Sequence, residues 1–577
     1  MATMNDSAVD VTSLMASFSL EGSSAPARSA PWRVLKFGGT SVGTAPRLRA
    51  VADIIWSASH RCRPAVVCSA MSGSTKSEGS TSLLLRAIDA AQSGLPDKER
   101  AVHDLLHRFM EYHIAIARDA LESGPARLDE ALGAVRAECH RLSLLFQAAQ
   151  TIDEISLQTR DAIVSAGERL SCQLVALVLQ NRGLDAVYVP VDRILKDLDC
   201  GTIAPDPADV DFLDAVAAQL AKAVESTPHR IPVITGFFGP VPGSLLQTVG
   251  RGYTDLAAGL VAVGLAADEL QIWKEVDGIY TADPRAVPTA HVLAQLTPDE
   301  AAELTYYGSE VVHPQTMTPV VVRAKIPIRI KNVLRPFAAG TIIVPDKDED
   351  GKEQDVDEDE WSDDGYASGS SSPRVSAALA PLEVHSRAAF AKPPRCPTAV
   401  TVKDNITLIN VRSNRKCRSH GFLSRVLALV DKYAVTVDLI TTSEVHVSLA
   451  VPVDPAHLAV TVGAHRVPKP LARFVGELVH LGTVQVQPHQ AILSLVGREM
   501  RNTVGVSAKL FGVLAMHGVN VEMISQGASE ITLSCVVAQH LSRTALVAVH
   551  DRLVKGLVVA DRPGASDPWL HVSHVFF

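Results

Sequence analysis

Two kinds of hydrophobic pattern alternate along residues 33–345. Runs at 63–71 and 229–239 are continuous enough to predict buried strands, and Ala186 to Val191 is a further candidate. Segments 101–122 and 128–150 repeat apolar residues every three or four positions, which predicts amphipathic helices. Strands alternating with helices predict an α/β fold, a layered αβα domain with a mainly parallel central sheet. In such sheets ligands bind beyond the carboxyl ends of the strands.

The last part of the chain contains an internal repeat. Residues 425–441, RVLALVDKYAVTVDLIT, align without gaps to residues 509–525, KLFGVLAMHGVNVEMIS. Each copy follows one strand-like run and continues into another. This arrangement predicts two small α+β modules, over 398–480 and 481–560.

The two copies differ at the turn after the aligned segment. The first has Ser443 and Glu444 where the second has Gly527 and Ala528. Because a carboxylate beside a turn suits an ammonium group, we predict a small-ligand site in the first copy. Two alternatives remain open: a repeat that serves only dimerisation, and a solvated loop carboxylate.

Three segments lack the pattern of a folded domain. Residues 346–397 are acidic and then rich in Ser, Gly and Pro, so they predict a linker that cannot bury enough apolar surface to fold. Residues 1–32 contain acidic residues and no long apolar core, unlike secretory or transit peptides, and predict a disordered tail. Residues 561–577 are expected to form a C-terminal tail. These features favour a cytoplasmic protein.

Composition excludes several classes of function. The net charge of -9 and the pI near 6.1 argue against a general nucleic-acid surface. We find no apolar run of the ~18 residues that a membrane span needs, and the richest run, 256–267, predicts a buried helix. The eight cysteines show no CxxC spacing, which indicates reduced thiols instead of a disulfide framework or zinc site.

The stretch VLKFGGTSVG places a lysine directly before a glycine-rich, hydroxyl-rich turn. This order is the reverse of the P-loop, in which the lysine follows the glycines. Gly38 and Gly39 would let backbone N–H groups converge on an anion, while Thr40 and Ser41 are predicted to cap the next helix. The alternative is an ordinary β-turn-α connection with a solvated Lys36.

Four further segments place polar residues at successive β-to-α junctions. They are CSAMSGSTKSE (68–78), SAGERLS (165–171), TVGRGYTDLAAGL (248–260) and KEVDGIYTADPR (274–285). Taken singly, each has a structural explanation: a carboxylate at a helix N-terminus, a cap, or a packed tyrosine. Taken together, they place lysine, arginine, carboxylates and glycine-rich turns at successive junctions of one sheet, which structural roles alone do not readily explain.

KFGGTSVG, SAGERLS, GRGYTD, VDGIYTADPR and YGSEVVHP occur in an order that closely resembles the aspartate kinases of the amino acid kinase family. Residues 421–445 resemble the first of that family's paired ACT regulatory modules. The resemblance covers Arg33 to Pro345 and Thr398 to Val537. The segment WKEVDGIYTADPR and the long acidic linker are most similar to those of fungal members. It implies an amino acid kinase domain followed by two ferredoxin-like ACT modules.

The resemblance also implies a reaction. The enzyme would transfer the ATP γ-phosphoryl group to the β-carboxylate of L-aspartate, giving 4-phospho-L-aspartate, the first step toward threonine, methionine, isoleucine and, in some organisms, lysine. A carboxylate nucleophile is already ionised at pH 7, so positioning and charge neutralisation would supply the catalysis. The implied cofactors are ATP and Mg²⁺, with the metal held mainly by ATP and by no protein metal site.

Roles follow residue by residue from the matched motifs. Lys36 would neutralise the transferring phosphoryl group, and Asp255 would lie near Mg-ATP. Glu168 would bind the α-ammonium of aspartate and Arg251 its α-carboxylate. The remaining implied substrate contacts are Thr40, Ser69, Thr75 and Thr254. The implied nucleotide contacts are Gly38, Gly39, Ser41, Lys274, Glu275, Tyr280 and Arg285. We expect Lys36→Ala to lower kcat by orders of magnitude with nearly unchanged folding.

The first ACT module matches positions that bind an amino-acid effector in the family. These are Ser419, Gly421, Phe422, Val437, Asp438, Ser443 and Glu444. The fungal resemblance favours threonine as the effector, with lysine possible, and paired ACT modules imply a homodimer or higher homo-oligomer.

Two departures from the family pattern concern the nucleotide. Many bacterial relatives have Thr-Asp at Lys274 and Glu275, and some have lysine at Glu310. The alternative functions are another amino acid kinase, such as a glutamate 5-kinase, and a catalytically inactive regulatory subunit. A fused homoserine dehydrogenase is disfavoured, because we find no strand-GxGxxG-helix fingerprint.

Overall fold

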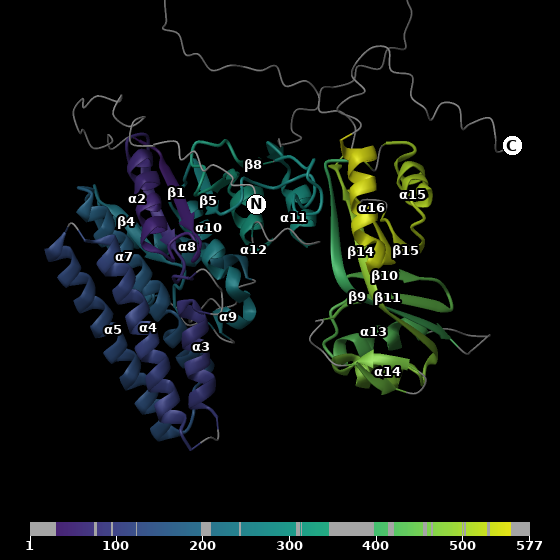
Figure 1. Ribbon diagram of the computed structural model, residues 1–577, viewed down its shortest axis with the longest axis horizontal. Helices are drawn as coiled ribbons and strands as arrows, with labels where there is room; N and C mark the ends of the chain where they lie inside the picture. Colours follow the sequence, from purple (N-terminus) through teal and green to yellow (C-terminus); the bar gives the residue numbers. More distant parts are fainter. Residues whose placement is uncertain are drawn as a thin grey trace, which may run out of the picture.

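The computed structural model of the 577-residue chain has two parts, one up to residue 345 and one from residue 397 (Figure 1). They are called the catalytic part and the regulatory part after the roles that the sequence resemblance implies. It describes residues 30–73, 78–93, 96–122, 124–197, 209–239, 241, 244–306, 312, 314–345, 397–413, 421–453, 459–462, 465–498, 500, 503–527 and 531–555. Nearly all of the predicted linker, nearly all of the N-terminal tail and the whole C-terminal tail lie outside these residues, as do Thr75, Glu310 and Ser419.

The catalytic part is built on an eight-stranded sheet with strand order β3-β4-β2-β1-β5-β7-β8-β6. Neighbouring strands are parallel except for the antiparallel pair β7–β8. The strands are β1 Trp32–Phe37, β2 Arg63–Cys68, β3 Ala186–Val189, β4 Ile231–Thr235, β5 Glu269–Lys274, β6 Gln295–Leu296, β7 Ile328–Asn332 and β8 Thr341–Ile343. The predicted strands and the mainly parallel sheet are therefore confirmed.

Helices cover both faces of this sheet, which explains why its central strands are continuously apolar. Val34 of β1 faces a core shared with α8 and α10, whereas the next residue, Leu35, faces a core shared with α2 and α7. The longer helices around the sheet are α2 Ala45–Ser59, α7 Ala166–Asn181, α8 Val210–Glu225 and α10 Tyr253–Gly264. The shorter ones are α6 Leu157–Val164, α9 Leu245–Thr248, α11 Pro298–Tyr306 and α12 Pro314–Met317.

Three helices extend away from the sheet as a bundle with a core of its own (Figure 1). They are α3 Ser80–Ala91, α4 Lys98–Ala120 and α5 Pro125–Ile152. The helices predicted at 101–122 and 128–150 correspond to α4 and α5, so their periodicity was a reliable signal.

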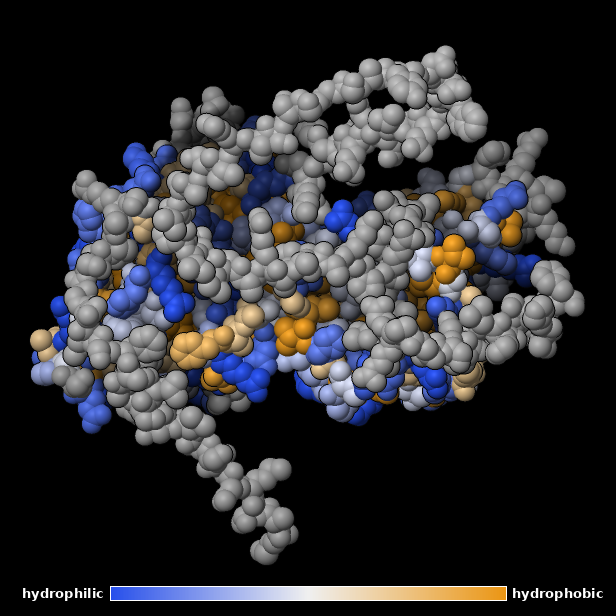
Figure 2. All heavy atoms as spheres, turned by 90° about the horizontal axis from the view of Figure 1, so that it is seen from above, coloured by the Kyte–Doolittle hydropathy of each residue, from blue (hydrophilic) through white to orange (hydrophobic). Residues whose placement is uncertain are grey.

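One described stretch, residues 157–181 of α6 and α7, is apolar and long enough to cross a membrane by length and composition alone. Of its most apolar window, 89% is buried inside the protein. Packing against the sheet and the helical bundle therefore accounts for its hydrophobicity. On the face shown in Figure 2, hydrophobic residues of the described part form separate patches among hydrophilic ones.

The regulatory part is built on one six-stranded sheet with strand order β10-β11-β9-β14-β16-β15. Its strands are β9 Ala399–Ser413, β10 Leu439–Thr442, β11 His446–Pro452, β14 Gly482–Val496, β15 Val521–Ser525 and β16 Thr532–Ala538. The helices α13 Phe422–Lys432 and α15 Val506–Met516 begin at aligned positions of the internal repeat, and α14 Ala472–Leu478 and α16 Ser542–Val549 complete the part.

The two repeats are joined more closely than their sequence suggests. Strand β9 pairs with β11 of the first repeat and, along nearly its whole length, with β14. Strand β14 in turn pairs with β16 of the second repeat. Both central strands are 15 residues long, so each is long enough to serve both repeats. A small core that contains Leu408, Leu439 and Met523 fills the space between the repeats.

Candidate active site

The carboxyl ends of β1, β2, β4 and β5 meet at one edge of the central sheet. Lys36 lies near the end of β1, opposite Val67 of β2 and Ile272 of β5, and is only 7% exposed. The alternative of a solvated surface lysine is therefore excluded. Its ammonium forms an ion pair with Asp255 of α10, with Nζ 2.6 Å from Oδ1.

The turn after β1 differs from the prediction in one respect. Thr40 and Ser41 do not cap the next helix, because α2 begins at Ala45 and its N-cap position is Thr44. The Ser41 hydroxyl instead donates to the Glu275 carboxylate after β5, at 2.9 Å. This bond joins the turn to the segment predicted to contact the nucleotide.

The two glycines of this turn have different surroundings. A Cβ on Gly39 would lie 2.3 Å from the carbonyl oxygen of Ala70, so only glycine allows this turn to pack against the loop after β2. A Cβ on Gly38 would meet nothing within 4 Å among the described atoms. Gly38 is thus the glycine with space beside it for a ligand.

A chain of hydrogen bonds links three other predicted substrate residues. The Ser69 hydroxyl donates to the Thr254 hydroxyl at 3.0 Å, and Thr254 donates to Glu168 Oε1 at 3.0 Å. The backbone N–H of Phe237, after β4, donates to Glu168 Oε2 at 2.8 Å. The structure therefore brings Ser69, Glu168 and Thr254 together, although they are far apart in the sequence. Thr254 is no simple helix cap.

Glu168 is 2% exposed, in the first turn of α7. Burial raises its pKa to about 7, while hydrogen bonds from Phe237, Tyr253 and Thr254 act in the opposite direction. A buried carboxylate with this pKa gains strongly from an adjacent cation. It is suited to binding an ammonium group.

The adjacent residues Thr254 and Asp255 connect the two halves of the site. Thr254 bonds to Glu168, and Asp255 bonds to Lys36. One turn of α10 is therefore bonded both to the buried Glu168 carboxylate and to the buried Lys36 ammonium. The backbone of Arg251 lies just before this turn, in the short 3-10 helix 250–252, and its side chain lies outside the described residues.

The predicted nucleotide residues follow β5. Lys274 ends that strand, and the Tyr280 hydroxyl donates to Asp277 at 3.3 Å. Arg285 forms an ion pair with Asp283, and its side chain is 90% exposed. Asn332 and Arg335 also donate to Asp277, at 2.7 and 2.9 Å, so Asp277 organises this segment.

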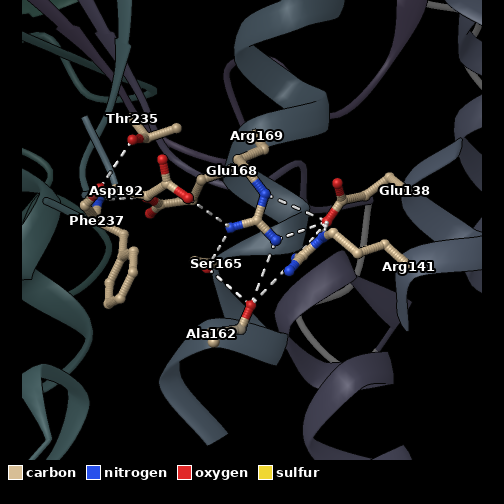
Figure 3. Close-up of polar contacts among 9 residues, drawn as sticks. All are labelled: Glu138, Arg141, Ala162, Ser165, Glu168, Arg169, Asp192, Thr235 and Phe237. Atoms are coloured by element: carbon tan, nitrogen blue, oxygen red, sulfur yellow. Dashed lines mark hydrogen bonds and ion pairs between the residues drawn. The ribbon is translucent and has the colours of Figure 1, made fainter. Parts of the chain in front are cut away.

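Sequence reasoning missed a buried ionic cluster behind Glu168. In Figure 3, Glu168 points toward Phe237 while its neighbour Arg169 points the opposite way, toward α5. Arg169 donates to Glu138 Oε1 at 2.6 Å, and Arg141 donates to the same oxygen at 2.7 Å (Figure 3). Glu138 occupies the apolar stripe of the predicted helix, where a charged residue is a signal that a buried partner exists.

Comparison with known proteins finds matches to both parts of the chain. A model of the amino acid kinase family matches residues 31–332, and a model of the ACT domain matches residues 493–553. The aspartokinase of Schizosaccharomyces pombe is 43% identical over 547 residues, 94% of this chain and 97% of that protein. The aspartokinase of Saccharomyces cerevisiae is 42% identical over 548 residues, 94% of this chain and 95% of that protein.

The chain belongs to the aspartokinases. It is therefore an ATP-dependent phosphotransferase of amino-acid biosynthesis. Its fold is similar to the crystal structure of Escherichia coli aspartokinase III in complex with aspartate and ADP, with a TM-score of 0.63 and 26% identity over 90% of this chain and 99% of that one. The same enzyme in complex with lysine and aspartate gives a TM-score of 0.64 at 26% identity.

The described effector residues predicted for this aspartokinase lie in three places: at the start of α13, directly before β10, and in the turn between β10 and β11. Gly421 has a φ of 78° directly before α13, and Phe422 is buried at the start of that helix. Ser443 and Glu444 are exposed in the turn between β10 and β11. Val437 and Asp438 precede β10, and Val437 is partly buried.

Asp438 has partners in both parts of the aspartokinase. Its side chain is 1% exposed, and Oδ2 lies 2.7 Å from the ammonium of Lys403 in β9. The hydroxyl of Tyr306, the last residue of α11, donates to Oδ1 at 3.3 Å. A residue predicted to bind the effector is thus already in contact with the catalytic part.

Proposed function

We propose that this aspartokinase transfers the γ-phosphoryl group of ATP to the β-carboxylate of L-aspartate. The observation that supports the proposal is the adjacency of Thr254 and Asp255, which connects the Glu168 carboxylate and the buried Lys36 to the same turn of α10. Glu168 would bind the α-ammonium of aspartate, and Arg251 its α-carboxylate. The β-carboxylate is then directed toward the phosphoryl group, with Ser69 and Thr254 bordering it.

No general base is required, because the β-carboxylate of aspartate is ionised at neutral pH. Lys36 would offset the charge that builds up on the transferring phosphoryl oxygens. Gly38 and Ser41 would border the phosphates, and the segment from Lys274 to Arg285 would border the nucleotide.

Mg²⁺ would enter with ATP and supply charge neutralisation at the phosphates. The residues present suit this arrangement: Asp255 is a buried carboxylate at the phosphoryl side of the site. Within the described residues, no group of three or more His, Cys, Asp or Glu side chains is placed to hold a metal alone. Asp255 would therefore support an ion that ATP mainly holds.

We further infer that an amino acid, threonine, inhibits the enzyme by binding the first repeat, where Glu444 is exposed beside Ser443. Lysine is the second candidate, since the structure of Escherichia coli aspartokinase III contains lysine. The enzyme is proposed to act in the cytoplasm as a homodimer or larger homo-oligomer.

One assay tests the reaction and its regulator. The purified chain receives ATP, Mg²⁺ and either L-aspartate or L-glutamate, and hydroxylamine traps any acyl phosphate as a coloured hydroxamate. We expect hydroxamate from aspartate alone, and suppression by threonine. Product from glutamate would indicate another amino acid kinase. Absence of product from both, with effector binding retained, would indicate an inactive regulatory subunit.

A further inference from the structure

Asp161 of α6 is a buried carboxylate that the proposed chemistry does not use. Its side chain accepts a hydrogen bond from the Ser244 hydroxyl at 2.6 Å and another from the backbone N–H of Leu245 at 2.8 Å. Asp161 is 3% exposed and Ser244 is fully buried. The carboxylate therefore binds the start of α9 in a site closed to solvent.

The segment that Asp161 holds leads directly to the predicted carboxylate clamp. Helix α9 ends at Thr248, and the 3-10 helix 250–252, which contains Arg251, follows it. Ser244 has a φ of 75°, a conformation that costs a non-glycine residue about 1–3 kcal/mol unless its surroundings impose it. The two hydrogen bonds to Asp161 help to hold this conformation, together with the bond that the Ser244 backbone N–H donates to the Val241 carbonyl at 3.2 Å.

The other side of Asp161 is firmly anchored. Ala162, the next residue, accepts hydrogen bonds from Arg169 at 3.4 Å and from Arg141 at 3.5 Å (Figure 3). The Ser165 hydroxyl, one turn later, accepts from Arg169 at 2.7 Å. The end of α6 is thus fixed to α5 and to the start of α7, where Glu168 lies.

We infer that Asp161 is a positioning residue that sets the distance between the Glu168 and Arg251 halves of the aspartate site. One carboxylate ties the helix leading into Glu168 to the segment leading into Arg251, and Tyr253 and Thr254 tie the far end of that segment back to Glu168. The amino and carboxylate groups of one substrate must reach both halves together, so a small displacement of the segment weakens both contacts. This inference rests on the proposed binding of aspartate at Glu168 and Arg251.

The test is Asp161→Asn, which keeps the shape of the side chain. The neutral amide has one acceptor oxygen in place of two and carries no charge, so one of the two bonds is lost or reversed and the other becomes weaker. Because a misplacement of about 1 Å can cost up to ~10²-fold, we expect KM for aspartate to rise at least tenfold. KM for ATP and kcat should change by less than about threefold, because the phosphoryl side is held separately through Lys36 and Asp255.

Two further variants keep the test decisive. Ser244→Ala removes one bond and retains the Leu245 bond, so its KM for aspartate should rise by less than that of Asp161→Asn. Asp214→Asn is the matched control, because Asp214 forms a surface ion pair with Arg323 away from the site. It should leave both KM values unchanged.

The outcomes separate the two levels of inference. A wild-type chain that forms no hydroxamate from aspartate would overturn the proposed function. A wild-type chain that is active, with folded Asp161→Asn and Ser244→Ala variants whose KM for aspartate is unchanged, would overturn the positioning role alone. Equal rises in KM for aspartate and for ATP would also overturn it, since they indicate general loosening of the fold. If Asp161→Asn does not fold, the KM of Ser244→Ala for aspartate is the test: a rise supports the positioning role, and an unchanged value overturns it.

Discussion

The Lys36–Asp255 pair shows how much of the active site depends on single buried charges. Both residues are only 7% exposed, and their charged atoms lie 2.6 Å apart. Removing one member of a buried ion pair leaves an uncompensated charge, which costs about 3–5 kcal/mol. The structure therefore revises the expectation that Lys36→Ala leaves folding nearly unchanged.

We predict that Lys36→Ala loses at least ~10²-fold in kcat, because a preorganised positive charge is removed from the phosphoryl group. It should also lose about 3–5 kcal/mol of the free energy of unfolding. Adding Asp255→Asn to this variant should restore part of that stability, because the carboxylate left without its partner is replaced by a neutral amide. It should not restore turnover. Urea unfolding and the hydroxamate assay measure the two effects.

The surface residue Lys98 gives the control for this prediction, since its ion pair with Asp153 spans 3.7 Å at the surface. Lys98→Ala should change neither stability nor turnover appreciably. If the double variant were less stable than Lys36→Ala, the buried pair would not be the source of the loss.

The proposed role of Glu168 predicts that substrate binding depends on pH. Its pKa is raised to about 7 by burial, so the protonated fraction grows as pH falls below 7, and a protonated carboxyl cannot pair with an ammonium group. We predict that kcat/KM for aspartate falls below pH 7, approaching tenfold per pH unit, while the β-carboxyl of aspartate remains ionised. Initial rates from pH 5.5 to 8.5 at saturating Mg-ATP measure this profile.

Glu168→Gln supplies the comparison for the pH profile. It should be poorly active and should lack the acid limb, because the amide does not titrate. A wild-type midpoint near the ordinary glutamate value, or an acid limb that persists in Glu168→Gln, would assign the titration to a different group.

Sequence motifs identified most of the residues that gather at the site, but not how they are arranged. Lys36, Glu168, Thr254 and Asp255 could be selected because their types and order match a family pattern. The backbone N–H of Phe237 and the capping carboxylate Asp161 could not, since their contacts depend on the crossing of distant segments. Helix periodicity was sufficient for α4 and α5. It places Glu138 on a buried face but does not identify Arg169 as its partner.

At the scale of elements, α11 connects the catalytic part to the regulatory part. Its Glu300 accepts hydrogen bonds from the Thr398 hydroxyl at 2.6 Å and from the Arg498 backbone N–H at 3.2 Å. Thr532 donates to Glu303, one turn later, at 2.8 Å. Tyr306 at the end of the helix reaches Asp438. One face of α11 therefore contacts both repeats.

We predict that Tyr306→Phe makes the enzyme more sensitive to threonine. Asp438 is a predicted effector contact, so an effector group that bonds to it competes with the Tyr306 hydroxyl, and a hydrogen bond to a charged group is worth about 1.5–3 kcal/mol. Removing that competing bond should lower the half-inhibitory threonine concentration at least about threefold, with basal kcat nearly unchanged. Inhibition curves at fixed aspartate and ATP measure the change.

Tyr433→Phe is the matched control, because the Tyr433 hydroxyl bonds to Glu477 within the regulatory part, at 3.1 Å. Its threonine response should equal that of the wild type. If Tyr306→Phe also responds to threonine like the wild type, the hydrogen bond between Tyr306 and Asp438 does not affect effector binding.

At the scale of the whole molecule, α13 presents apolar residues to solvent. Phe422 and Val426 point into the core of the first repeat, whereas Leu423 and Leu427, one turn apart, are 41% and 43% exposed. Exposed leucines at this spacing form a stripe that a second copy of the chain could cover. This stripe supports the proposed homo-oligomer.

We predict that Leu427→Glu shifts the protein toward monomer, because a buried charge at a subunit contact is not compensated. Light scattering coupled to size-exclusion chromatography at several concentrations measures the mass. Leu334→Glu, at an exposed position of the catalytic part, is the control and should keep the wild-type mass. Equal masses for all three proteins would place the subunit contact away from α13.

The shared strands β9 and β14 have a consequence for how the two repeats respond to a ligand. Neither repeat can open without breaking strand pairs that the other also uses, so the regulatory sheet behaves as a single cooperative folding unit. If an amino acid binds only to the first repeat, as proposed, it would also stabilise the second by mass action, although the second lacks the serine and the carboxylate of that turn. The second repeat would then become more rigid without a ligand of its own, and its contacts through Arg498 and Thr532 would extend this effect to α11.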